Sequence, residues 1–126
     1  MDWYNTLNKP LLTPPNEIFT SVWIILYILM GISFIIYIKS GINKEKIKGL
    51  VCFFLQLLLN FSWGSIFFSM KNISIALIVV CLMWIFTLLT VVFFYKQSKI
   101  SAILLIPYFL WISFAIYLNY EFLKLN

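Results

Sequence analysis

Four long apolar stretches are the feature that most constrains what this chain can fold into. They cover about residues 18–38, 49–69, 73–95 and 101–122. At about 1.5 Å rise per residue, a helix of roughly 20 residues crosses the 30 Å hydrocarbon core of a bilayer, so each stretch is long enough to span it. Hydrophobic residues make up 63% of the chain and charged residues 10%, which leaves too few polar groups for a soluble domain. The sequence predicts an all-α, multi-pass membrane protein.

The connections between these stretches are short. They cover Lys39–Lys48, Met70–Asn72 and Lys96–Ile100. Short connections favour antiparallel neighbours, so we expect each helix to lie beside its predecessor in an up-and-down bundle of four helices. A chain of 126 residues is expected to form one transmembrane domain over residues 1–126.

The nine basic residues are all lysines, and they are distributed unevenly between the two ends of the predicted bundle. One end carries Lys39, Lys44, Lys46, Lys48, Lys96 and Lys99, and the other carries Lys9, Lys71 and Lys124. Because cytoplasmic loops collect lysine, the first end is predicted to be cytoplasmic, in a bacterial cell membrane. The net charge of +5 does not indicate a nucleic-acid partner, since the lysines flank apolar stretches and suit lipid headgroups.

Several kinds of chemistry lack the residues that they need. The chain has no histidine, which is the commonest metal ligand and general base, so neither a metal nor a cofactor is expected. Cys52 and Cys81 lie within apolar stretches and are expected to be buried and unpaired. No carboxylate or lysine lies deep in a predicted span, which argues against a proton-coupled transporter. No nucleophile with a base appears either, so any reaction would depend on tryptophan or tyrosine rings.

Polar and aromatic side chains form stripes on three of the predicted helices. The stripes are Trp23 and Tyr27, then Gln56, Asn60 and Trp63, and finally Tyr108, Trp111, Ala115 and Asn119. Spacings of three, four and seven residues place each set on one helix face. Facing inward, the stripes would form an aromatic pocket with a few polar groups, as is typical of small-molecule sites. Alternatively, the amides serve as interhelical hydrogen bonds and the tryptophans as packing.

The segment before the first span, residues 1–17, is rich in proline and aromatic residues. Pro10, Pro14 and Pro15 fix the local backbone and remove hydrogen-bond donors. We expect this segment either to fold over the mouth of the bundle as a stiff lid or to anchor in the membrane interface through its aromatic residues. These two interpretations stay open.

Three separated segments resemble the tryptophan-rich sensory protein family, whose mammalian members are called translocator protein or peripheral benzodiazepine receptor. The first segment contains Trp3, Tyr4, Leu7, Lys9, Pro10, Thr13, Pro14, Pro15, Val22, Trp23 and Tyr27; the second contains Gln56, Leu57, Leu59, Asn60, Phe61, Trp63, Phe67 and Phe68; the third contains Leu105, Pro107, Tyr108, Trp111, Phe114, Ala115, Leu118 and Asn119. The resemblance covers nearly the whole chain in the family's order.

The resemblance implies a membrane receptor that binds porphyrins, cholesterol-like lipids and benzodiazepine-type compounds, with a homodimer as its expected assembly. Carried over position by position, it implies that the ligand is bound by Tyr4, Pro14, Trp23, Tyr27, Asn60, Trp111 and Ala115. It also implies that a light-dependent breakdown of porphyrin would use Trp23 and Trp111. A sensor or carrier for flat hydrophobic molecules is therefore our first hypothesis, a porphyrin-degrading enzyme the second, and a purely structural membrane subunit the third.

One departure concerns the number of helices. The family pattern has five, and its first helix precedes the loop that contains the Trp-Tyr pair, whereas Met1 here stands two residues before Trp3. We expect either a short variant or a start placed too late. A further helix ahead of Trp3 would return the N-terminus to the lysine-rich side.

Overall fold

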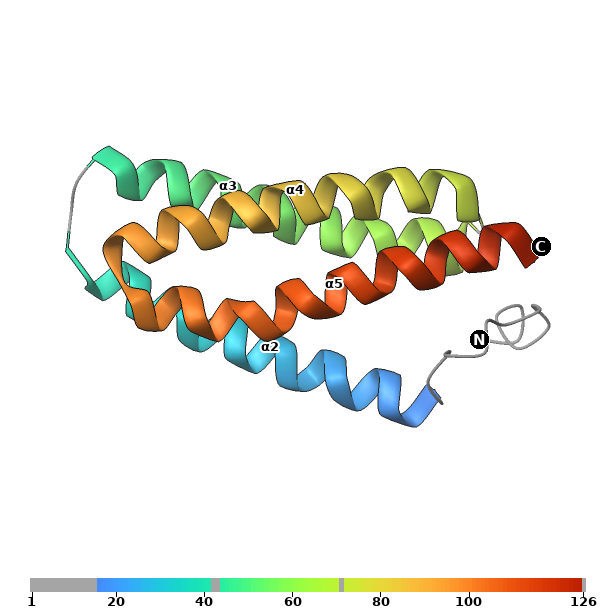
Figure 1. The fold of residues 1–126 in the computed structure, drawn as a ribbon, viewed down its shortest axis with the longest axis horizontal. Helices are drawn as coiled ribbons and strands as arrows, with labels where there is room; N and C mark the ends of the chain where they lie inside the picture. Colours follow the sequence, from blue (N-terminus) through green and yellow to red (C-terminus); the bar gives the residue numbers. More distant parts are fainter. Residues whose placement is uncertain (1–15, 42–43, 71, 126) are drawn as a thin grey trace.

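The computed structural model describes residues 16–41, 44–70 and 72–125. Within them lie four α-helices and one π-helical turn. The α-helices are α2 (Asn16–Lys39), α3 (Lys44–Gly64), α4 (Ile73–Gln97) and α5 (Lys99–Leu125), and the π-helix η1 (Ser65–Ser69) continues α3. The predicted all-α bundle is confirmed for the described residues, and the helices run up and down as expected (Figure 1).

The helices are long and apolar enough to cross a membrane. The candidate spans are Ile18–Lys39, Lys46–Phe67, Ile73–Gln97 and Lys99–Leu125. Large hydrophobic side chains remain exposed along their outer faces; Ile24 is 56% exposed, Ile78 61% and Leu110 61%. Exposed apolar surface on every helix requires a hydrocarbon surrounding, because water would not solvate it.

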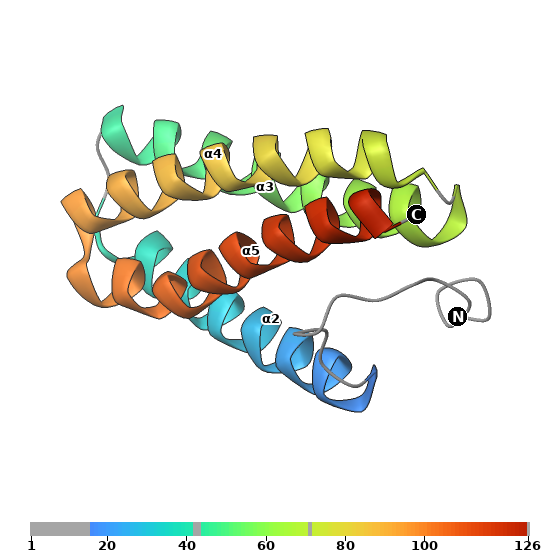
Figure 2. The same cartoon turned by 45° about the vertical axis from the view of Figure 1, so that its right-hand side comes forward.

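The expected pairing of consecutive helices holds for two of the three pairs. Helix α3 packs along α4, and α4 packs along α5, whereas the backbone of α2 packs chiefly against α5. Helix α2 lies at an angle to the others, and its N-terminal end is splayed away from the C-terminal end of α5 in both views (Figures 1 and 2). The prediction that α2 lies directly against α3 was wrong. The backbones of these two helices are not closely packed, and their contacts are made mainly by long side chains.

The lysine-rich end holds α2 in place through buried polar contacts. The Lys46 ammonium, on a side chain only 7% exposed, donates hydrogen bonds to the backbone carbonyls of Ile38 and Gly41 at the end of α2. The Tyr37 hydroxyl donates to the Lys46 carbonyl at 3.1 Å, and its ring stacks on Phe94 with centroids 3.8 Å apart. A cation at a helix C-terminus satisfies free carbonyls and opposes the helix dipole. Helix α2 is therefore tied to α3 and α4 at this end and diverges at the other.

The interior of the bundle contains both apolar and polar side chains. Met83, Leu105 and Ile112 are fully or almost fully buried in it. Cys52 is buried as expected, but Cys81 is exposed on α4, so the prediction of burial was wrong for Cys81. An apolar stretch of sequence does not distinguish the core from the lipid-facing side, because both environments are hydrophobic.

Candidate aromatic ligand site

Trp23 on α2 is the centre of an aromatic cluster at the splayed end of the bundle. Its ring centroid lies 5.7 Å from that of Tyr27, 6.2 Å from Trp63 on α3, and 6.3 Å from both Tyr108 and Trp111 on α5. These separations are typical of stacked and edge-to-face aromatic pairs. The cluster joins three helices that are distant in sequence.

A chain of hydrogen bonds runs beside these rings. The Tyr27 hydroxyl donates to Asn60 Oδ1 at 2.5 Å, Asn60 Nδ2 donates to the Tyr108 hydroxyl at 2.7 Å, and that hydroxyl donates to Gln56 Oε1 at 2.6 Å. Gln56 Nε2 continues the chain toward Met30 Sδ at 3.7 Å. Gln56, Asn60 and Tyr108 are buried, whereas Tyr27 is 37% exposed. This hydrogen-bond chain thus begins at the partly exposed Tyr27 and ends in the core.

A second polar link fixes the end of α3. The Trp63 indole Nε1 donates to Asn119 Oδ1 at 3.0 Å, and Asn119 Nδ2 donates to the Ile73 carbonyl at 3.0 Å. Asn119 therefore binds both the last part of α3 and the start of α4. Together these two sets of hydrogen bonds show that Gln56, Asn60 and Asn119 act as interhelical hydrogen-bonding groups. This is one of the two interpretations of the stripes.

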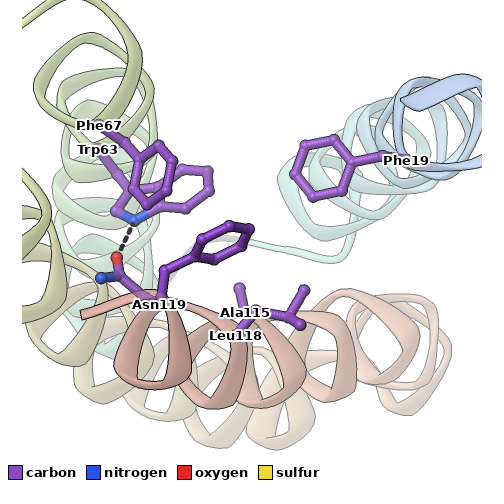
Figure 3. Close-up of a pocket in the computed structure, with 7 residues that line it drawn as sticks. Phe19, Trp63, Phe67, Ala115, Leu118 and Asn119 are labelled. Carbon is purple, nitrogen blue, oxygen red and sulfur yellow. Dashed lines mark hydrogen bonds between the residues drawn. The ribbon is translucent and has the colours of Figure 1, made fainter. Parts of the chain in front are cut away.

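Two cavities beside the cluster are lined by both Phe19 and Trp63. A groove of about 390 Å³ opens between α2 and the end of α3, and it is lined by Phe19, Trp23, Tyr27, Asn60, Phe61, Trp63, Gly64 and Ser65. A smaller, more enclosed cavity of about 20 Å³ lies deeper, lined by Phe19, Trp63, Phe67, Ala115, Leu118, Asn119 and Phe122. Figure 3 shows Phe19 pointing into this space from α2, with Trp63 and Phe67 on the opposite side and Ala115, Leu118 and Asn119 on α5. Phe19 and Trp63 border both spaces and separate them.

The structure brings together five of the residues predicted from sequence. Trp23, Tyr27 and Asn60 line the open groove, and Ala115, 3% exposed, lines the inner cavity. Trp111 lines neither space; it supports the cluster from behind, with its ring 5.8 Å from Phe19 and 6.3 Å from Trp23. The predicted residues Tyr4 and Pro14 lie outside the described part of the chain.

Several residues that line the two cavities were not predicted from the sequence. Phe19 is the most important omission, since it faces both cavities. It precedes Trp23 by four residues and so extends the same helix face, a signal that could have identified it. Trp63 was assigned to an inward stripe but not to the site. Gly64 and Ser65 line the groove where α3 passes into the π-helical turn, a change that hydropathy cannot reveal.

Comparison with known proteins identifies the family of this chain. A family model described as "TspO/MBR family" matches residues 1–125. The chain belongs to the TspO/MBR family. It is 42% identical over 125 residues to "Tryptophan-rich protein TspO" of Chlorobaculum tepidum, covering 98% of this chain and 79% of that protein. It is 41% identical to the Archaeoglobus fulgidus protein of the same name, covering 98% and 80%.

Animal members of the TspO/MBR family are also similar to this chain. "Translocator protein" of Homo sapiens is 34% identical over 120 residues, covering 94% of this chain and 71% of that protein. Family membership and the four spanning helices make this chain a multi-pass membrane protein. The fold class and the family inferred from sequence are thereby confirmed.

Proposed function

We propose that this TspO/MBR protein is a membrane receptor or carrier that binds porphyrin-like and other flat hydrophobic molecules in the groove between α2 and α3. The observation that carries the proposal is the packing of Trp23 against Tyr27, Trp63, Tyr108 and Trp111 beside an open groove. Flat aromatic ligands stack on tryptophan and tyrosine rings. The groove volume of about 390 Å³ lies within the roughly 300–1,000 Å³ typical of small-molecule sites.

The polar groups of the groove supply orientation. Tyr27 is half-exposed at the groove wall, and its hydroxyl is held by Asn60 at 2.5 Å. A hydroxyl fixed in this way presents a defined lone pair to a ligand donor, while buried Asn60 is already committed to Tyr27 and Tyr108. We expect a ligand to stack on Trp23 and to be oriented by Tyr27. The family resemblance implies that Tyr4 and Pro14 also take part in binding.

A porphyrin titration in the dark tests the proposal. Protoporphyrin IX added to the purified protein in detergent should quench tryptophan fluorescence to saturation, and Trp23→Leu should lower the affinity by about 1–3 kcal/mol, because it removes a stacking partner. Trp84→Phe is the matched control, since the Trp84 indole donates to Ser113 at 2.9 Å and lines neither cavity of the site. Equal affinity in the wild type and in folded Trp23→Leu would contradict the proposal.

The second hypothesis, light-dependent porphyrin degradation, is supported by one separate observation. The Trp23 and Trp111 rings lie 6.3 Å apart in an edge-to-face arrangement, and Trp111 Nε1 is buried with no hydrogen-bond partner among the described residues. Illumination of the complex discriminates the two functions. A new absorbing product that is lost in Trp111→Phe would support degradation of porphyrin. If porphyrin is unchanged under light, the protein binds it without degrading it. A protein that neither binds nor converts porphyrin would fit the structural-subunit hypothesis.

A further inference from the structure

A second groove lies on the other side of the bundle, at the lysine-rich end between α4 and α5. It has a volume of about 330 Å³ and is lined by Val91, Val92, Tyr95, Lys96, Ala102, Ile103 and Ile106. Apart from Lys96 and the Tyr95 hydroxyl, its walls are hydrocarbon, and Val92, Ile103 and Ile106 are exposed. In a bundle that spans a bilayer, such a groove faces lipid acyl chains.

Lys96 lines this groove, and Lys99 contacts the ring of Tyr95, another of its lining residues. Helix α4 ends at Gln97 and α5 begins at Lys99, so Lys96 and Lys99 flank a single tight turn. Lys96 Nζ lies 5.4 Å from the centre of the Phe93 ring, and Lys99 Nζ lies 5.8 Å from the centre of the Tyr95 ring. Both lysine side chains are exposed. The Tyr95 ring lines the groove, so its contact with Lys99 keeps that ammonium near the groove, and Lys96 is itself a lining residue.

Among the described side chains, Lys96 and Lys99 form no ion pair with a carboxylate. The carboxylate among these side chains belongs to Glu121, which lies 3.6 Å from Lys124 at the opposite end of the bundle. Two cations above an apolar groove match a molecule with an anionic head and a hydrocarbon tail. Anionic headgroups attract basic residues at the membrane surface with about 1 kcal/mol per lysine.

We propose that the α4–α5 groove binds one anionic phospholipid, with its phosphate on Lys96 and Lys99 and one acyl chain along Val92, Ile103 and Ile106. This lipid site is distinct from the aromatic groove, with which it shares no lining residue. The bound lipid would join the end of α4 to the start of α5. Its binding does not depend on whether the aromatic groove takes porphyrin.

Native mass spectrometry of the full chain tests the lipid site. The protein is released from micelles containing equal amounts of dioleoylphosphatidylglycerol and dioleoylphosphatidylcholine, and the retained lipids are counted. The wild type should retain one phosphatidylglycerol in preference to phosphatidylcholine. The double variant Lys96→Gln/Lys99→Gln should reduce that preference by roughly 25-fold, or about 2 kcal/mol. Lys124→Gln removes an exposed lysine from the opposite end and should leave the preference unchanged.

A third variant tests the acyl-chain part of the lipid site. Ile103→Trp places a large ring in the groove at an exposed position, so it should lower the retention of phosphatidylglycerol at least fivefold while the lysines remain. Thermal unfolding of each variant verifies that it is folded. Equal retention of the two lipids by the wild type, an unchanged preference in the double lysine variant, or full retention in Ile103→Trp would each overturn the proposal. Inorganic phosphate can also be added to the micelles before release. If it lowers the retention of phosphatidylglycerol while Ile103→Trp does not, the lysines form an ion site and the proposal is overturned as well.

Discussion

At the scale of single residues, the Tyr108 hydroxyl is the central link of the hydrogen-bond chain between Asn60 and Gln56. It accepts a hydrogen bond from Asn60 and donates one to Gln56, and both of these partners are buried on α3. In hydrocarbon, a polar group that loses its partner cannot turn to water instead. The Tyr108 oxygen therefore joins two amides of α3 to α5, in addition to the separate hydrogen bond between Trp63 and Asn119.

We expect Tyr108→Phe to lower the free energy of unfolding by about 1–2 kcal/mol. The variant removes two hydrogen bonds, and interhelical hydrogen bonds in membranes average about 0.6 kcal/mol each. A further cost arises because Asn60 Nδ2 and Gln56 Oε1 lose their partner. Equilibrium unfolding in detergent measures the change. Tyr27→Phe is the matched control, because it removes one bond at a half-exposed position. If Tyr108→Phe lowers the free energy of unfolding no more than Tyr27→Phe does, the Tyr108 hydroxyl does not contribute more to stability than the Tyr27 hydroxyl.

Ala115 is expected to limit the size of the inner cavity. Its methyl group faces a space of about 20 Å³, which accommodates about one water-sized group. Ala115→Leu adds three carbons, so we expect it to displace Phe19 and Trp63 and to weaken porphyrin binding by about 1–3 kcal/mol, a typical overpacking cost. The titration described above measures it. Ala115→Ser adds a single atom and should bind nearly as the wild type does; unchanged affinity in folded Ala115→Leu would place this residue outside the binding determinants.

At the scale of helices, the hydropathy pattern predicted the number and direction of the elements, but not their lateral spacing. The inward stripe of Gln56, Asn60 and Trp63 is confirmed, since all three are buried. The angle of α2 could not be predicted, because it depends on the anchoring of Tyr37 and Lys46 at one end. The open groove follows from that angle. The sequence pointed to Trp23, Tyr27 and Asn60 in its lining but did not indicate that the groove is open to the side.

The end of α2 is held by a close contact that leaves no room for a side chain at Gly49. A Cβ atom added to Gly49 would lie 2.3 Å from the Tyr37 hydroxyl oxygen, and Tyr37 is fully buried. We expect Gly49→Ala to lower the free energy of unfolding by about 1–3 kcal/mol. Gly31→Ala is the matched control on α2, where an added Cβ meets no atom within 4 Å; better helix propensity should make it neutral or slightly stabilising. A Gly49→Ala protein as stable as Gly31→Ala would refute the close contact.

At the scale of the whole molecule, the distribution of lysine predicts the orientation in the membrane. Lys39, Lys48, Lys96 and Lys99 lie at one end of the described bundle, together with the buried Lys46. Positive charge is retained on the cytoplasmic side. This end, and with it the lipid groove beside Lys96, is expected to face the cytoplasm, whereas the aromatic groove lies nearer the other surface.

Labelling of single cysteines tests this orientation. In a background with Cys52→Ala and Cys81→Ala, Ser74→Cys near the start of α4 should react with a membrane-impermeant maleimide on intact cells. Ser40→Cys, at the lysine-rich end, should react only after the cells are permeabilised. Both serines are exposed, so the two sites are comparable in access. The reverse pattern of labelling would show that the lysine count does not set the topology.

The sideways opening of the aromatic groove determines which ligand concentration sets its occupancy. Phe61 on the groove wall is 59% exposed, and Tyr27 is 37% exposed, so a molecule dissolved among the acyl chains reaches Trp23 without passing through water. Its relevant concentration is its mole fraction in the bilayer, set by its partition coefficient, and lipid itself is the competitor. A dissociation constant referred to the aqueous phase would then change with the amount of detergent or lipid in the sample, although no contact in the site had changed.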